Sequence, residues 1–333
     1  MRRRQRAPYV SSDRTYRNES MRPWSYRLAR LLCAATVLLL GAGAMVTSTG
    51  SSLAVPDWPL AYGQLFPPMV GGILYEHGHR LVAASVGLLA IALAAWLGWA
   101  EPRRWVRALG LAALGIVIAQ GLLGGVTVLL LLPKAVSIGH ALLAQGFFLA
   151  TVARVQVTAP GWEALLERSR RPARSRAALW ASLTLAALLL ELLLGAIVRH
   201  FNAGLAIPDF PLAYGRLMPP LSAFPIAIHF LHRVGALVVL LLVAGTLWEV
   251  RRKHADEAAL RRPALALAWL VALQIALGAA VIWTQRAPTV TTLHLVNGAL
   301  LIGTAGLLTL RAWLLAAPVG AAPRGSPLES PAR

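Results

Sequence analysis

The sequence predicts an all-α membrane protein of eight transmembrane helices, arranged as two pseudo-symmetric four-helix bundles with both termini in the cytoplasm. Three features of the sequence support this prediction: long apolar runs, an uneven distribution of arginine, and an internal repeat. Of the 333 residues, 57% are hydrophobic and only 14% are charged. Soluble domains usually carry about 25% charged residues, so lipid must surround much of this chain.

Eight segments are long and apolar enough to cross a bilayer, which takes roughly 20 residues in a helix. A β-barrel is excluded because runs such as Val37–Leu40 do not alternate between apolar and polar residues. The predicted spans are approximately 28–48, 79–99, 106–130, 136–156, 177–199, 226–248, 264–284 and 290–314.

The net charge of +19 follows the membrane topology rather than a nucleic-acid surface. Segments 1–30, 100–107, 154–176, 249–262 and 311–333 hold 26 of the 32 Lys and Arg residues. Positive charge is enriched in cytoplasmic segments, so these five segments and both termini are assigned to the cytoplasm. No nucleic-acid partner is expected. The remaining six basic residues are Arg80, Lys134, Arg199, Arg216, Arg233 and Arg286.

The spans and charges divide the chain into five parts. We expect a basic cytoplasmic tail at 1–27, a bundle at 28–158, a cytoplasmic linker at 159–176, a second bundle at 177–315 and a cytoplasmic tail at 316–333. The basic first tail is expected to be disordered or to lie on anionic headgroups. The first span could also be a signal peptide cleaved at Ala42-Gly43-Ala44; because it has a counterpart later in the chain, we expect it to be retained.

The two predicted bundles are repeats of one sequence. LAVPDWPLAYGQLFPP at 53–68 and LAIPDFPLAYGRLMPP at 205–220 are identical at 12 of 16 positions, at an offset of 152. The offset is 153 between His79 and His232 and 154 between His140 and His294. Four spans per repeat give both halves the same orientation, unlike the inverted repeats of many transporters.

The repeated segment lies in two long outer loops. Asp57 and Asp209 each stand in a Pro-Asp-aromatic-Pro turn, where a carboxylate commonly caps the turn; a functional role stays open. The aromatic residues of the loops suit an interface belt or could cover the edge of a flat ligand. They are Trp58, Tyr62, Phe210 and Tyr214.

Histidines gather near the predicted outer face, where seven of the eight lie. Four occupy equivalent positions in the two halves, at one expected membrane depth at the starts of even-numbered spans. Two histidines on facing helices suit the axial ligation of an iron porphyrin, whereas zinc prefers three or four protein ligands. The alternative for a single histidine is an interhelical hydrogen bond or an interface anchor. The four candidate iron ligands are His79, His140, His232 and His294.

Small residues beside these histidines would leave room for a macrocycle close to the backbone. They are Gly78, Gly139, Ala141, Gly235 and Ala236. The chain has a single cysteine, Cys33, and no C-x-x-C motif, so any heme must be held without covalent attachment.

Charged residues near the histidines are candidates for chemistry. Arg80 and Arg233 follow candidate ligands and could pair with heme propionates, or extend to lipid headgroups. Glu76 precedes His79 by three residues, which places both on one helix face; it could handle protons or only favour the helix dipole. The second half has His229 instead, so chemistry is assigned to the first half. Glu191 could bond to a glutamine across helices or move protons, and this stays open.

With these residues, the chain resembles the heme A synthase family over about 28–314. The resemblance rests on the PDWPLAYGQLFPP loop, on Glu76-x-x-His79-Arg80, and on His140, His232-Arg233 and His294. It implies oxidation of the C8 methyl of heme O to a formyl group through a hydroxymethyl intermediate, giving heme A for terminal oxidases. His79 and His140 would hold the substrate heme, His232 and His294 a heme B cofactor, and Glu76 would be the catalytic carboxylate.

The resemblance also implies partners and a location. Heme O would come from the heme O synthase, and the protein would lie in lipid, in a bacterial inner membrane with its heme sites towards the outer face. The electron acceptor and the oligomeric state stay open, a homo-oligomer included. One departure is Ala61, where some members carry a loop cysteine; a loop disulfide is therefore excluded.

Two rival functions remain from the sequence. A cytochrome b-like electron carrier would use both histidine pairs for fixed hemes, and extraction would yield heme B alone. A non-catalytic heme transporter is the other rival, although the parallel repeats count against it. The roles of His77, His200 and His229 also stay open.

Overall fold

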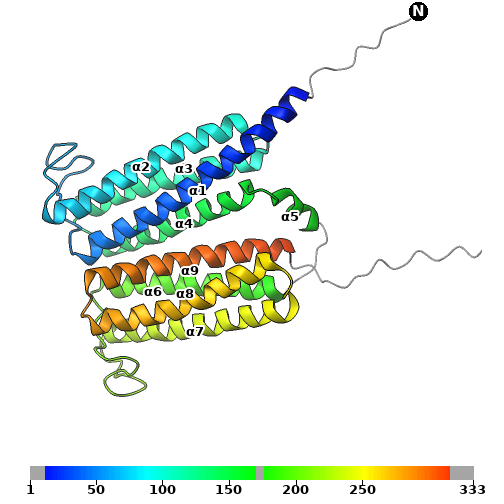
Figure 1. Ribbon diagram of the computed structural model, residues 1–333. Coiled ribbons are helices and arrows are strands. Elements are labelled where there is room, and N and C mark those ends of the chain that lie inside the picture. The colour runs from blue at the N-terminus through cyan, green and yellow to red at the C-terminus, as the bar shows by residue number, and fades with distance from the viewer. Residues whose placement is uncertain (1–11, 170–175, 316–333) are drawn as a thin grey trace, which may run out of the picture.

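A computed structural model describes residues 12–169 and 176–315, which form nine helices and no β-strand (Figure 1). The helices are α1 (Ser12–Ser48), α2 (Gly71–Ala100), α3 (Arg104–Leu129), α4 (Lys134–Thr158), α5 (Trp162–Ser169), α6 (Arg176–His200), α7 (Phe224–Lys253), α8 (Ala258–Trp283) and α9 (Pro288–Leu315). In this part of the chain, all except α5 are long and apolar enough to span a membrane. The prediction of eight spans in an all-helical, multi-pass membrane protein is confirmed.

Several helix boundaries differ from the prediction because the helices continue through polar residues beyond their apolar runs. The first helix extends back to Ser12, although residues 1–27 were expected to be a tail. The short helix α5 lies inside the predicted linker 159–176. The second span was expected from residue 79 but begins at Gly71, since Glu76 and His77 interrupt its apolar run. Residues 1–11 and the predicted tail 316–333 lie outside the described residues.

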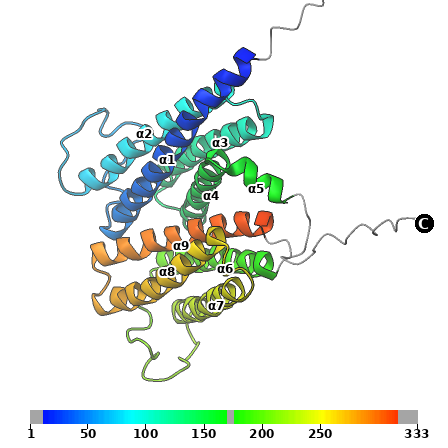
Figure 2. The same cartoon turned by 45° about the vertical axis from the view of Figure 1, so that its right-hand side comes forward.

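The two long loops lie at one end of the helices, and α5 lies at the other (Figures 1 and 2). The first long loop is 49–70 and the second is 201–223. Since eight spans bring the chain back to its starting side, α1 begins and α9 ends at the end away from these loops. In the first half, α1 contacts α2 and α4, and α3 also contacts α2 and α4. In the second half, α6 contacts α7 and α9, and α8 also contacts α7 and α9.

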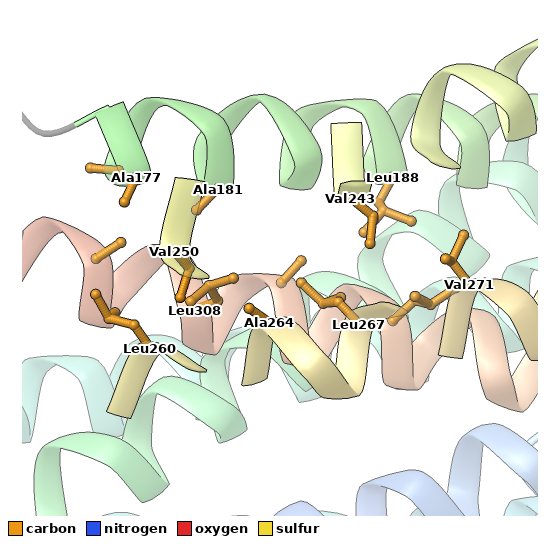
Figure 3. Packing of buried hydrophobic residues seen from close by; sticks show 14 of the residues in the cluster. Ala177, Ala181, Leu188, Val243, Val250, Leu260, Ala264, Leu267, Val271 and Leu308 are labelled. Atoms are coloured by element: carbon orange, nitrogen blue, oxygen red, sulfur yellow. The ribbon is translucent and has the colours of Figure 1, made fainter. Parts of the chain in front are cut away.

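Apolar side chains, from alanine to phenylalanine, pack these helices together. Helix association in lipid depends on van der Waals contact, because the lipid is as apolar as the side chains. In the first half, the buried residues Leu32, Val86, Leu93, Val106 and Phe147 join four helices. The second half is packed similarly by Ala177, Ala181, Leu188, Val243, Val250, Leu260, Ala264, Leu267, Val271 and Leu308 (Figure 3).

The two halves meet mainly through α9, which contacts α1 and α4, while α4 also contacts α6. A Cβ at Gly303 would lie 2.6 Å from Phe148 of α4, so this glycine makes room for the aromatic ring. Nearer the end of α9 that lies away from the long loops, both Nη2 and Nε of Arg311 donate to Oε1 of Gln156, at 2.8 and 3.0 Å. Apolar and polar contacts therefore join the halves along the length of α9.

Matching turns lead into the two long loops. Gly50 and Asn202 follow α1 and α6 with φ of 72° and 54°. In each case the next amide closes the helix end, with Ser51 N–H donating to Val46 O at 2.9 Å and Ala203 N–H donating to Val198 O at 2.8 Å. This is the pattern of a Schellman motif, in which a left-handed residue terminates a helix. Both loops consequently leave their helices in the same way.

Candidate functional site

The four candidate histidines lie inside their helices at matching positions. His79 and His232 are the ninth residues of α2 and α7, and His140 and His294 are the seventh residues of α4 and α9. At 1.5 Å per residue, they lie about 9 to 12 Å from the helix start. The expectation that they stand at the opening of their spans was therefore wrong, because the helices begin earlier than their apolar runs.

A glycine on the neighbouring helix faces each of these imidazole rings. A Cβ added to the glycine would lie 3.0 to 3.3 Å from the Cε1 atom of the ring, closer than ordinary van der Waals contact. The pairs are Gly43 with His79, Gly124 with His140, Gly195 with His232, and Gly278 with His294. The missing side chains let the Cε1 edge of each ring approach the next helix closely.

The nitrogens of these rings fit a role in metal ligation. In the described part of the chain, Nδ1 of all four histidines is buried and has no partner at good hydrogen-bond geometry. Backbone carbonyls nevertheless lie close to three of the rings, Leu39 to His79, Gln120 to His140 and Gln274 to His294. Within each half the two histidines are close enough to interact electrostatically, His79 with His140 and His232 with His294. A buried polar atom that lacks a partner is costly, so each Nδ1–H calls for an acceptor, which leaves Nε2 as the ring nitrogen able to bind a metal. Residues 12–169 and 176–315 contain no cluster of three metal-binding side chains, and paired imidazoles suit a heme iron.

Glutamine side chains hold the second histidine of each half. Nε2 of Gln120 lies 3.2 Å from Nε2 of His140 and donates to the His140 carbonyl at 3.0 Å. Nε2 of Gln274 lies 3.3 Å from Nε2 of His294, and its Oε1 accepts from Asn297 at 2.7 Å. Glu191, for which a bond to one of these glutamines was considered, instead lies against His232.

Glu76 and Arg80 fasten the first long loop to α2. Oε2 of Glu76 accepts from the Val55 amide at 2.9 Å, and Oε1 accepts from Nη2 of Arg80 at 2.7 Å. Nη1 of Arg80 also donates to the carbonyls of Asp57 and Leu60, each at 2.7 Å. The Glu76 carboxylate is buried, so the loop covers it.

The second half makes the same attachment with a histidine. Nδ1 of His229 accepts from the Ile207 amide at 3.2 Å, and Nε2 lies 3.4 Å from Nε of Arg233. Arg233 donates to the carbonyls of Leu212 and Asp209, each at 2.8 Å. Arg80 and Arg233 thus both donate to loop carbonyls, a role that the sequence did not suggest. Glu76 and His229 occupy equivalent structural positions, although one is a carboxylate and the other an imidazole.

Asp57 and Asp209 cap the turns of the two loops. Asp57 accepts from the amides of Tyr62 and Gly63 at 2.7 and 2.8 Å, and Asp209 accepts from Tyr214 and Gly215 at the same distances. The turn-capping interpretation is therefore correct. These amides hold the pKa of both aspartates below the ordinary value of 3.8, with the Gly63 and Gly215 amides as the largest causes.

We expect the Asp57 cap to persist in mild acid. Because its pKa is depressed in the folded loop, its contribution to stability is present above the ordinary value and is lost only as the pH falls through the lower folded pKa. Limited proteolysis by an acid protease between about pH 2 and 6 should cut the first long loop only below pH 3.8. Asp57→Ala should be cut throughout. Equal cleavage of both proteins at pH 5 would contradict the cap.

The remaining histidines near the loops have separate surroundings. Nε2 of His77 lies 2.9 Å from the Leu65 carbonyl, so this buried ring adds another attachment for the first long loop. His200, at the end of α6, lies within electrostatic range of His140 from the other half. Neither ring faces a glycine in the described residues as the four candidate ligands do.

The glycine partners were missed by sequence reasoning. Gly78 and Gly139, which were expected to make room near the histidines, have only Met69 and Leu123 within 4 Å of an added Cβ. A signal was nevertheless present, because Gly43 and Gly195 share the repeat offset of 152, and Gly124 and Gly278 share the offset of 154. Small residues repeated at the offset of the ligands identify the facing helix surfaces.

The fold defines a multi-pass membrane protein with a half-buried histidine pair in each half. The chain belongs to the COX15-CtaA family of cytochrome oxidase assembly proteins, whose profile matches residues 69–305.

Similar proteins cover most of the chain. A heme A synthase of Symbiobacterium thermophilum is 35% identical over 248 residues, which is 71% of this chain and 78% of the relative. A heme A synthase of Alkalihalophilus pseudofirmus is 31% identical over 78% of this chain and 87% of the relative. A heme A synthase of Mesorhizobium japonicum is 27% identical over 82% and 85%, respectively.

Proposed function

We propose that this protein is a heme A synthase, a membrane oxidoreductase that converts the C8 methyl of heme O to a formyl group through a hydroxymethyl intermediate. The observation that carries this proposal is the duplicated histidine site in which a carboxylate stands three residues before the first histidine in the first half alone. Each half has two imidazoles against glycines with unpartnered Nδ1 atoms, whereas Glu76 is replaced by His229 in the second half. The similarity to heme A synthases over 71% to 82% of this chain supports the same reaction.

In the first half, His79 and His140 would hold the iron of the substrate heme O. Conversion of the methyl to a hydroxymethyl group with the oxygen of a water, and then to a formyl group, releases two electrons and two protons at each stage, so an electron acceptor and a proton acceptor are needed beside the substrate. Glu76 lies one helical turn from His79 and is held by Val55 and Arg80. We assign it as the catalytic carboxylate, which would take up a proton at Oε1 or Oε2.

In the second half, His232 and His294 would hold a resident heme B. When bound, this group supplies one-electron redox chemistry. The protein supplies two imidazoles, and Gly195 and Gly278 leave their rings room. Arg80 and Arg233 are proposed contacts for propionates, in addition to the loop carbonyls that they already bind, because a guanidinium carries five donors.

The proposed arrangement in the membrane follows the arginine distribution. The halves 28–158 and 177–315 would be pseudo-symmetric four-helix bundles, for the substrate heme and heme B respectively, joined by the linker 159–176. Both termini would be cytoplasmic, so the histidines would lie towards the outer face of a bacterial inner membrane. Heme O would be delivered by the heme O synthase.

Expression beside a heme O source tests the proposed reaction. Chromatography of extracted hemes should show heme A, with the hydroxymethyl intermediate, only in cells that contain this protein. Recovery of heme B alone would favour an electron carrier, and recovery of unmodified heme O would favour a transporter. Either result would overturn the assignment as a synthase.

A substitution at Gly124 should impair the substrate site while sparing the resident heme. Since its added Cβ already lies 3.1 Å from Cε1 of His140, Gly124→Val would displace the ring, and overpacking of about 1 to 3 kcal/mol would weaken heme O retention about 5- to 150-fold. Gly121→Val is the matched control, because nothing lies within 4 Å of its Cβ. Retained heme O per protein is the measurement, and equal retention in both variants would contradict the contact.

A further inference from the structure

We propose that Glu191 is a positioning residue that accepts a hydrogen bond from Nδ1–H of His232 and thereby lowers the reduction potential of the resident heme. The inference rests on the proposed function, because it takes His232 as an iron ligand through Nε2. It goes further by assigning a role to a carboxylate that sequence analysis left without one. It also gives the two histidine sites different electronic properties.

The geometry places the Glu191 carboxylate beside the ring. Oε1 of Glu191 on α6 lies 2.8 Å from Nδ1 of His232 on α7. Neither atom forms another hydrogen bond in the described chain, and their present angle is not that of a hydrogen bond. Both side chains are mostly buried, with 14% of Glu191 and 24% of His232 exposed. A rotation of the carboxylate or the ring satisfies two buried polar groups at once, which removes a substantial desolvation cost.

Two glycines form the rest of this contact. Gly195 lies one helical turn after Glu191 and faces the imidazole ring, while Gly235 lies three residues after His232 and faces the carboxylate. A Cβ at position 235 would collide with the Glu191 carboxylate. The helix surfaces are therefore complementary, with a side chain opposite a glycine in both directions.

The first half provides an internal comparison. At the repeat offsets, Glu191 corresponds to Leu39 and Gly235 corresponds to Val82, whereas the glycine and histidine at Gly43 and His79 are retained. The carboxylate and the glycine that makes room for it thus occur together in one half, and two apolar side chains replace both in the other. The pair is specific to the half assigned to the resident heme.

A carboxylate beside Nδ1 of His232 changes how strongly this histidine donates to a bound metal. A metal-bound histidine commonly donates its second ring N–H to a carboxylate or carbonyl, which fixes the ring orientation and makes the coordinating nitrogen a stronger donor. A stronger donor stabilises ferric over ferrous iron, so the reduction potential falls. No comparable carboxylate contact is found among the described residues for His79, His140 or His294.

Redox titration of the purified holoprotein tests the inference. Glu191→Gln should raise the midpoint potential of the resident heme enough to increase its ferrous-to-ferric ratio about tenfold at the wild-type midpoint, which is about 59 mV for one electron. The low-spin electron paramagnetic resonance signal of this heme should shift with it, as expected for a weaker imidazole donor. Glu249→Gln is the matched control, because it removes a carboxylate from the far end of α7 and should shift neither quantity.

A double variant guards against misfolding. Glu191→Leu with Gly235→Val copies the apolar pair of the first half and restores packing, and it should raise the potential at least as much as Glu191→Gln. An unchanged potential in both variants would overturn the inference and leave the proposed function intact. Retention of the resident heme in His232→Ala, as in the wild-type protein, would instead overturn the assigned ligand and hence the proposed function.

Discussion

Glu76→His is expected to lower the rate of heme A formation about 10²- to 10⁴-fold, the usual contribution of a general acid or base, while the first long loop stays attached. The second half shows why the fold should survive. There His229 accepts an amide from its loop as Glu76 does, at 3.2 Å compared with 2.9 Å. Histidine can therefore replace the loop contact without supplying the carboxylate.

The measurement compares chemistry with loop attachment in the same protein. Extracted hemes are followed over time in cells that supply heme O, and limited proteolysis reports whether the 49–70 loop is still protected. Glu76→Ala serves as the second variant and should lose both properties, because it removes the acceptor of Val55. Heme A formation by Glu76→His at the wild-type rate would show that the carboxylate only fastens the loop.

His294→Ala is expected to abolish the spectrum of a six-coordinate, low-spin b-type heme. This histidine supplies one of two proposed axial ligands, and its ring fills the space opposite Gly278, where an added Cβ would lie 3.3 Å from it. Alanine offers no ligand, so heme B should be lost or become high-spin. Absorption and electron paramagnetic resonance spectra of the purified variant measure the change.

His254→Ala is the matched control for this loss. His254 follows α7 at the end away from the long loops, far from both histidine pairs, so its removal should leave the spectrum unchanged. A full low-spin b-type signal in His294→Ala would contradict the division of roles between the halves. The first-half variant His140→Ala should keep this signal and lose heme O retention instead.

Much of the fold followed from the sequence because the spans are set by the bilayer. About 20 apolar residues per helix can be counted without knowing which helices touch. The start of α2 was misplaced by eight residues because Glu76, His77 and His79 make a buried helical turn polar. The helix α5 was missed because eight residues within a basic linker give no apolar span.

The site was predictable only where its residues are local in sequence. The repeat identified the histidines, and the Pro-Asp-aromatic-Pro turn identified the capping role of Asp57, which bonds residues five and six positions away. Contacts across helices were harder to predict: the glycine opposite His79 was marked only by the repeat offset, and nothing in the sequence marked the pairing of Glu191 with His232. The hold of Arg80 on loop carbonyls was missed for the same reason, since Asp57 lies 23 residues before it.

The most direct test of the account is the heme content of the wild-type protein, purified in detergent from cells that make hemes B and O. Two paired-imidazole sites predict a coloured protein with low-spin heme, from which extraction yields heme B together with heme O, heme A or the hydroxymethyl intermediate. A colourless preparation without iron, which also fails to bind added porphyrin, would contradict both sites.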